Sequence, residues 1–256
     1  MDKSSGLSIS LYQWPPGTGT ESIFPRCVVF QRICNLAGIN AQIHSVTVPE
    51  PGDDFDQKLR QRLINIPLME VNGVRYTDSR EIIEFLLTVA DFEGLNNLRR
   101  LDVGNSLITQ EWANLVFINS LVYSRWAREE NFLRFTSHVN WGKLQGLHLS
   151  LTKLRAILLS YLERTLFTFS SEGDFEKHLA DQMLSLEIKL MGQKYFEPLA
   201  DAPTLTDLYM FMVVQGFYSD DLEESVWIRN NYPNVSAWYK RVDRATQKRT
   251  QGIFKE

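Results

Sequence analysis

The stretch from residue 66 to residue 86 constrains the fold of this chain more than any other. Ile66 to Val71 is a short, mainly apolar run with a proline, Pro67, at its start. The pair Asn72-Gly73 follows, and both residues accept the positive φ of a type I′ turn. Val74 to Thr77 then returns as a second short strand. The stretch therefore predicts a β-hairpin that opens at a proline.

A helix is expected directly after this hairpin. Either Asp78 or Ser79 can cap it, because both side chains accept hydrogen bonds from free backbone N–H groups. Pro67 cannot donate a hydrogen bond to a sheet, so it belongs at the first residue of its strand or in a special bend. The apolar residues after the cap recur at helical spacing, namely Ile82, Ile83, Leu86 and Leu87.

The rest of the first half alternates strands and helices. Apolar and polar residues alternate before residue 14, which is typical of a strand with one buried face. Glycine at position 38 is a typical helix stop. In chain order we expect a strand over Leu7–Gln13, a helix over Pro25–Leu36 ending at Gly38, a strand over Ile43–Val48, a short helix over Phe55–Arg62, and then the hairpin and its helix.

The second half carries only helical patterns. Its apolar stripes recur at the spacing of amphipathic helices and indicate core positions. Thr204 and Asp207 form a capping-box pattern at the start of a wholly apolar helix, which must therefore be buried. The expected helices are Leu107–Trp126, Phe132–Gly146, Leu149–Phe169, Phe175–Met191, the helix after Thr204, and Trp227–Arg241. With a short linker near Asn96-Asn97, the predicted domains are residues 1–92 and 98–256.

The order β-α-β-α-β-β-α and the series from residue 66 to residue 86 resemble the thioredoxin-like domain of the glutathione transferase family. The Thr204–Asp207 capping box and the run Tyr232-Pro233-Asn234-Val235 resemble that family's helical domain. The resemblance covers about residues 7 to 242. It implies an α/β thioredoxin-like N-terminal domain followed by an all-α C-terminal domain, with glutathione as co-substrate.

The resemblance also assigns a glutathione site. The proline matching Pro67 is cis in the family, and the backbone N–H and C=O of the preceding residue, here Ile66, pair with the cysteinyl part of glutathione. The acidic-Ser pair, here Asp78 and Ser79, holds the γ-glutamyl end at a helix N-terminus, which favours a carboxylate. The structural alternative is that Pro67 only shapes a turn and Ser79 only caps a helix.

The catalytic position departs from the family pattern. Phe24 stands where a Ser or Cys would open the first helix. A hydroxyl donor near the glutathione sulfur would favour its thiolate, and the candidates are Ser22 and Tyr12, with Thr20 beside them. Each has a structural alternative: Ser22 as a helix cap and Tyr12 as a half-buried strand residue.

Three functions follow from these observations. The first is a transferase that conjugates glutathione to a hydrophobic electrophile held against Tyr123 and Trp126, with Arg125 between them as a carboxylate ligand or a structural ion pair. The second is a non-catalytic binding or assembly module, which is favoured by Phe24 in place of a Ser or Cys. Motifs such as Leu11-Tyr12-Gln13-Trp14 resemble the metaxin and failed-axon-connections branch, in which such a module is expected. The third, a thiol-disulfide reductase using Cys27, lacks a cysteine three positions earlier.

Composition and residue spacing limit the partners and the cellular location that this chain is expected to have. A net charge of −4 gives no basic excess for nucleic acid, and no apolar run reaches the ~20 residues that span a bilayer. The histidines and cysteines lack metal-ligand spacing, so no metal is expected. Cys27 and Cys34 are about two helical turns apart, too far for a disulfide. We expect a cytoplasmic protein that forms a homodimer.

Overall fold

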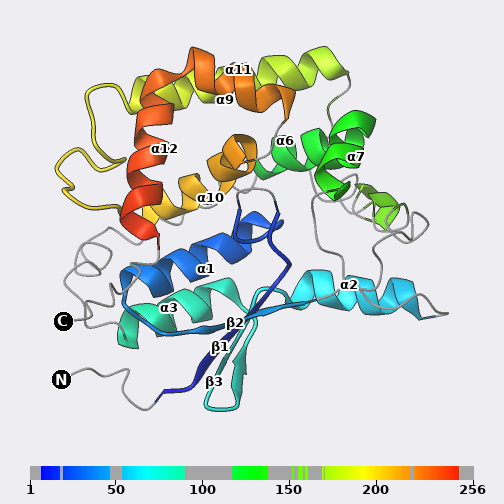
Figure 1. Ribbon diagram of the computed structural model, residues 1–256, viewed down its shortest axis with the longest axis vertical. Helices are drawn as coiled ribbons and strands as arrows, with labels where there is room; N and C mark the ends of the chain where they lie inside the picture. The colour runs from blue at the N-terminus through cyan, green and yellow to red at the C-terminus, as the bar shows by residue number, and fades with distance from the viewer. Residues whose placement is uncertain are drawn as a thin grey trace, which may run out of the picture.

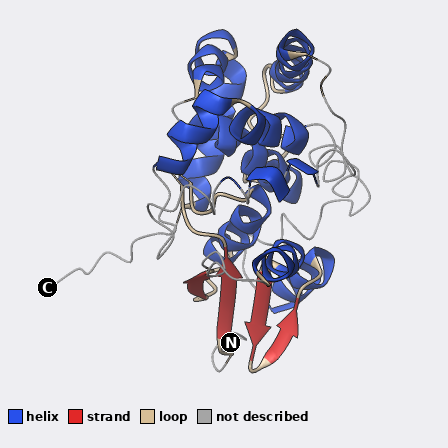
Figure 2. Cartoon of the chain, turned by 90° about the vertical axis from the view of Figure 1, so that its right-hand side faces the viewer, coloured by secondary structure: helices blue, strands red, loops and turns tan. Residues whose placement is uncertain are grey.

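The computed structural model describes residues 7–17, 20–46, 54–89, 117–137, 152, 155–157, 159–160, 169, 171–219 and 222–247. Its first part is a four-stranded sheet with three helices, and the rest is helical (Figures 1 and 2). The expected fold class, a thioredoxin-like α/β part followed by an all-α part, is confirmed. The expected linker near residues 96–97 lies outside the described residues, so the division into two domains stays a prediction.

The sheet has the strand order β2-β1-β3-β4. β1 runs parallel to β2 and antiparallel to β3, which pairs antiparallel with β4. Asn72 and Gly73 both have positive φ, 49° and 85°, which confirms the predicted hairpin turn between β3 and β4. The bounds are β1 Ile9–Gln13, β2 Gln42–Ser45, β3 Leu68–Val71 and β4 Val74–Tyr76.

Helix α1 lies between the sheet and the helical part (Figure 1). It begins at Pro25, which is a favourable first residue because an N–H at that position would have no partner within the helix and proline has none. After the helix the chain turns at Gly38, whose φ is +65°. Both features agree with the sequence prediction. α2 extends three residues beyond the expected Arg62, to Asn65. The helices of this part are α1 Pro25–Leu36, α2 Phe55–Asn65 and α3 Ser79–Val89.

The helical part is built around α10, whose residues 205–218 are all buried. This confirms the prediction of a core helix. Several expected bounds differ in detail, and the expected helices Phe132–Gly146 and Leu149–Phe169 lie mainly outside the described residues. The expected helix Trp227–Arg241 is two helices that meet at Tyr232, and part of the expected Leu107–Trp126 helix is the π-helix η2. The bounds are α6 Asn119–Val122, η2 Tyr123–Ala127, α7 Glu129–Ser137, α9 Glu172–Lys189, α10 Leu205–Ser219, α11 Glu223–Asn231 and α12 Pro233–Thr246.

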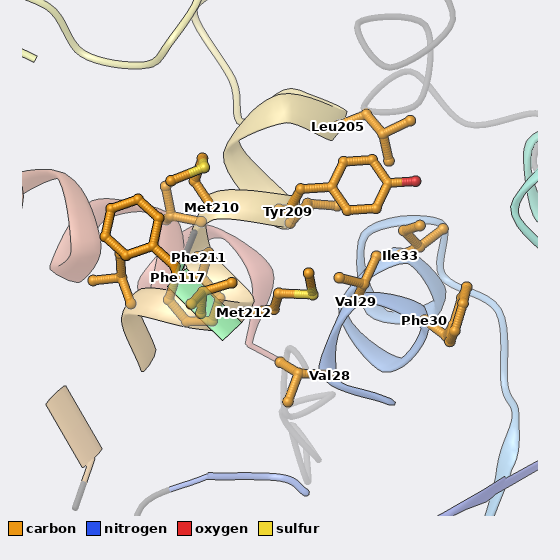
Figure 3. Packing of buried hydrophobic residues seen from close by; sticks show 14 of the residues in the cluster. Val28, Val29, Phe30, Ile33, Phe117, Leu205, Tyr209, Met210, Phe211 and Met212 are labelled. Atoms are coloured by element: carbon orange, nitrogen blue, oxygen red, sulfur yellow. The ribbon is translucent and has the colours of Figure 1, made fainter. Parts of the chain in front are cut away.

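The two parts share one apolar core across α1 and α10. Figure 3 shows Tyr209 and Met212 of α10 facing Val29 and Ile33 of α1. The same cluster continues through the sheet residue Leu11 on the other side of α1. Because one helix contributes to both sides, the sheet and the helical part bury apolar surface against each other.

Polar contacts, which the sequence did not reveal, also join the two parts. Arg32 on α1 is 2% exposed and forms ion pairs with Glu21 and with Asp243 of α12, the latter at 2.8 Å. Its guanidinium lies 4.8 Å from the ring centre of Phe211 on α10. Gln215 of α10 donates to Glu21 at 2.8 Å. One buried cation therefore joins α1 to both α10 and α12.

Candidate functional site

The site predicted from the sequence begins at the bend between α2 and β3. The Ile66–Pro67 peptide bond is cis, and Pro67 is buried. The N–H of Ile66 donates to the carbonyl of Arg62, at an N···O distance of 3.1 Å, and so completes the last turn of α2. A ligand that accepted a hydrogen bond from this N–H would have to replace Arg62 as the acceptor.

Asp78 and Ser79 have different roles at the start of α3. Asp78 is exposed, and its Oδ1 accepts from the N–H groups of Arg80 at 2.8 Å and Glu81 at 3.3 Å, so Asp78 is the cap. Ser79 is the half-buried first residue of the helix. Within the described part of the chain its hydroxyl has no hydrogen-bond partner. Ser79 is therefore available to a ligand, while the Asp78 carboxylate beside it suits an ammonium group.

Ser22 is committed to the loop that leads into α1. It is only 2% exposed, and its Oγ donates to the carbonyl of Trp14 at 3.0 Å. The same oxygen accepts from the N–H of Phe24 at 3.3 Å. The neighbouring Thr20 donates to the carbonyl of Ser22 at 2.9 Å. Thr20 Oγ1 also lies 3.3 Å from Oε1 of Gln215. The Ser22 hydroxyl proton is therefore directed at a backbone carbonyl, and that of Thr20 has a backbone and a side-chain acceptor.

Tyr12 lies on the other face of the sheet. Ile9, Leu11 and Gln13 are the buried residues of β1, and Tyr12, between the last two, is half-buried. Its ring stacks on His44 of β2, with centroids 4.8 Å apart. Because successive strand residues point to opposite faces, Tyr12 points away from the side on which Leu11 packs with α1. The structure does not bring Tyr12 and Ser22 together.

Aromatic rings surround the start of α1. Trp14 lies against Phe24, with ring centroids 5.2 Å apart. Trp126, 3% exposed, packs at 5.9 Å from Phe132 and 5.5 Å from Phe135. We call the group the aromatic cluster; it contains Trp14, Phe24, Trp126, Phe132 and Phe135, and the aliphatic residues Ile23, Leu59, Ile66 and Ile157 pack into it. The aromatic cluster joins the loop before α1, Ile66 beside Pro67, and the helical part.

Tyr123 is directed elsewhere. Its ring packs against Phe169 at 5.1 Å and Phe175 at 4.9 Å, beside α9 and within the main core. Trp126, three residues further along the π-helix, belongs to the aromatic cluster instead. The two residues expected to hold an electrophile together are therefore in separate clusters.

Arg125 lies between them and is 2% exposed. Its guanidinium donates to the carbonyls of Ile23 at 3.1 Å and Gly216 at 3.2 Å. It also lies 5.0 Å from the ring centre of Phe135. The sequence suggested that Arg125 is either a carboxylate ligand or part of an ion pair. In the structure its contacts with the two carbonyls join the loop before α1 to α10.

Burial also determines the chemistry of the two cysteines. Removal from water raises the pKa of the Cys27 thiol to about 11, although hydrogen bonds with Trp14 and Ser22 act in the other direction. Burial raises the pKa of Cys34 to about 12. Both thiols are thus protonated near neutral pH, whereas a reactive cysteine is a thiolate. The reductase hypothesis has no support in this geometry.

No group of three or more His, Cys, Asp or Glu side chains among the described residues is placed to hold a metal ion. None of the helices that the structure describes is both long enough and apolar enough to cross a membrane.

Comparison with known proteins relates this chain to glutathione transferases through structure. No family model and no curated protein matches the sequence. Similar solved structures include the beta-etherase LigF from Sphingobium sp. strain SYK-6, with TM-score 0.56 and 16% identity over 92% of this chain and 95% of that one. A Gtt2-class glutathione S-transferase of Vibrio parahaemolyticus has TM-score 0.56 and 13% identity, covering 94% and 96%.

A delta-class glutathione transferase of Nilaparvata lugens has TM-score 0.52 and 16% identity, covering 93% of this chain and 89% of that one. These similarities extend over nearly the whole length of each protein. The chain therefore has the fold of the glutathione transferases.

Proposed function

We propose that this protein binds glutathione as a glutathione transferase-like protein. The observation that carries the proposal is the start of α3, where the Ser79 hydroxyl has no partner among the described residues and lies at a helix N-terminus. Such an N-terminus favours a carboxylate, and Asp78 supplies the opposite charge for the ammonium group of the same γ-glutamyl end. The solved structures with this fold include a glutathione S-transferase-I bound to lactoylglutathione.

In this proposal the backbone of Ile66 beside Pro67 pairs with the cysteinyl part of glutathione. The thiol would lie near the start of α1, and a hydrophobic electrophile would lie against Trp126 or Tyr123. Conjugation would need Ser22 to turn its O–H from the Trp14 carbonyl to the sulfur, or Tyr12 to reach it from the other face. Thiolate stabilisation by such a donor is the chemistry that the transferase reading requires.

A second candidate is a non-catalytic binding module of the metaxin-like kind, with a residual glutathione site. The aromatic cluster favours it, because Phe24 supplies a ring where a Ser or Cys would stand. The buried Ser22 hydroxyl, already donating to a carbonyl, favours it as well. A cytoplasmic location and a homodimer remain predictions for either candidate.

Calorimetric titration with glutathione tests binding. We expect saturable binding to the wild type and a loss of about tenfold or more in Ser79→Ala, because a hydrogen bond to a charged group is removed. Thr77→Ala, at an exposed position two residues earlier, is the matched control and should bind as the wild type does. No binding at millimolar glutathione, or equal affinity for Ser79→Ala, would refute the proposed site.

Conjugation to 1-chloro-2,4-dinitrobenzene then separates the two candidates. A turnover that Ser22→Ala or Tyr12→Phe lowers while glutathione affinity is kept supports the transferase. Binding without turnover for a panel of aryl and alkyl electrophiles supports the non-catalytic module.

A further inference from the structure

A groove on the helical part has no role in the proposed glutathione site. It has a volume of about 420 Å³ and runs along the C-terminal half of α12, the red helix of Figure 1. The described residues that line it are Tyr195, Ala237, Lys240, Arg241, Arg244 and Ala245. A volume of this order suits a small organic ligand, since ligand pockets span roughly 300–1,000 Å³.

Three of these side chains are cations on one helix. Lys240 and Arg244 are both exposed and four residues apart, a spacing that places like charges side by side and destabilises a helix. Within the described residues neither forms an ion pair. Positive charge is therefore concentrated near the C-terminal end of α12, where the helix dipole favours cations, and an anion in the groove would reduce the repulsion between the two side chains.

Arg241 and Tyr195 give the groove a fixed wall. Arg241 donates to the carbonyl of Lys194 at 2.5 Å, which holds its guanidinium beside the next residue, Tyr195. Burial raises the pKa of Tyr195, and the negative charges of Asp207 and Asp201 act in the same direction, while the Arg241 charge lowers that pKa. The Tyr195 hydroxyl has no hydrogen-bond partner in the described part of the chain, so it is free to donate to a ligand.

We propose that this groove binds a phosphorylated small molecule with a compact apolar body. Lys240, Arg241 and Arg244 hold the phosphate, because guanidinium and ammonium groups are the side chains that match its oxygens. Tyr195, Ala237 and Ala245 contact the apolar body. The site lies on residues separate from Pro67 and Ser79, and its occupation does not depend on glutathione.

Calorimetric titration of the full chain with phenyl phosphate tests the proposal. We expect one saturable site, and about tenfold weaker binding in Arg244→Gln and in Lys240→Gln, because each variant loses a charge-assisted hydrogen bond. Lys177→Gln removes the same charge from an exposed position near the N-terminal end of α9, and this variant should bind phenyl phosphate as the wild type does. Thermal unfolding of each variant verifies that it is folded.

Two comparisons identify the chemistry of the ligand. Benzoate, with one negative charge on the same ring, should bind more weakly than phenyl phosphate, and phenol should not bind. Saturating glutathione and the Ser79→Ala substitution should leave phenyl phosphate binding unchanged, which separates this groove from the glutathione site. No saturation at several millimolar phenyl phosphate, or equal loss in Lys177→Gln and Arg244→Gln, would overturn the proposal.

Discussion

Replacement of Asp207 by alanine should lower the free energy of unfolding more than most single substitutions in this chain. The side chain is fully buried at the start of α10. Its Oδ1 accepts from the N–H of Phe196 at 3.0 Å and from the indole Nε1 of Trp238 at 2.7 Å. Its Oδ2 accepts from the N–H of Thr204 at 2.9 Å and from the Thr204 hydroxyl at 2.6 Å. One carboxylate thus joins three segments of the helical part.

Alanine would leave these donors without an acceptor. A buried donor stranded in this way costs about 1–3 kcal/mol, and only the Thr204 hydroxyl is free to rotate to a new partner. The carboxylate itself is costly to bury, which is why the pKa of Asp207 is raised, and its removal returns part of the loss. We therefore expect a net decrease of about 3–5 kcal/mol, typical of removing one member of a buried charged network.

Urea denaturation followed by far-ultraviolet circular dichroism measures this decrease. Asp207→Asn keeps one acceptor oxygen but turns an amide toward the Thr204 N–H, so it should lose about 2 kcal/mol. Asp181→Ala, at an exposed position on α9, should stay within about 0.5 kcal/mol of the wild type. The reasoning fails if Asp207→Ala unfolds within about 1 kcal/mol of the wild type.

Two further predictions concern a buried ion pair and a buried thiol. Arg32→Met should lower the free energy of unfolding in urea by about 3–5 kcal/mol, because it leaves Asp243 and Glu21 without their cation. Arg75→Met removes an exposed ion pair with Glu70 and should lower it by at most about 1 kcal/mol. Equal losses would contradict the role given to Arg32. Burial raises the pKa of Cys27 from an ordinary 9.0 to about 11. At pH 8 Cys27 should therefore react with iodoacetamide about a hundredfold more slowly in the native protein than in urea, and its rate should increase as the pH rises toward 11. Equal rates in the native and the unfolded protein would show that the thiol is not buried.

Local sequence determined most of the secondary structure. Asn72-Gly73 specified its turn because both residues adopt positive φ at low cost, and Thr204 with Asp207 specified the start of α10 because each side chain bonds a nearby backbone group. Helical spacing also identified the buried face of α9, through Leu179, Met183, Leu186 and Leu190. These signals lie within a few residues of one another, so a sequence displays them directly.

Tertiary structure alone decided what the functional residues contact. The hydroxyl of Ser22 donates to Trp14 rather than facing a ligand. Tyr123 and Trp126 both belong to the π-helix η2, yet they pack into different clusters. The partners of Arg32 on α12 are more than two hundred residues away along the chain. No local pattern encodes such contacts, because packing of distant elements sets which atoms meet and which lose access to water.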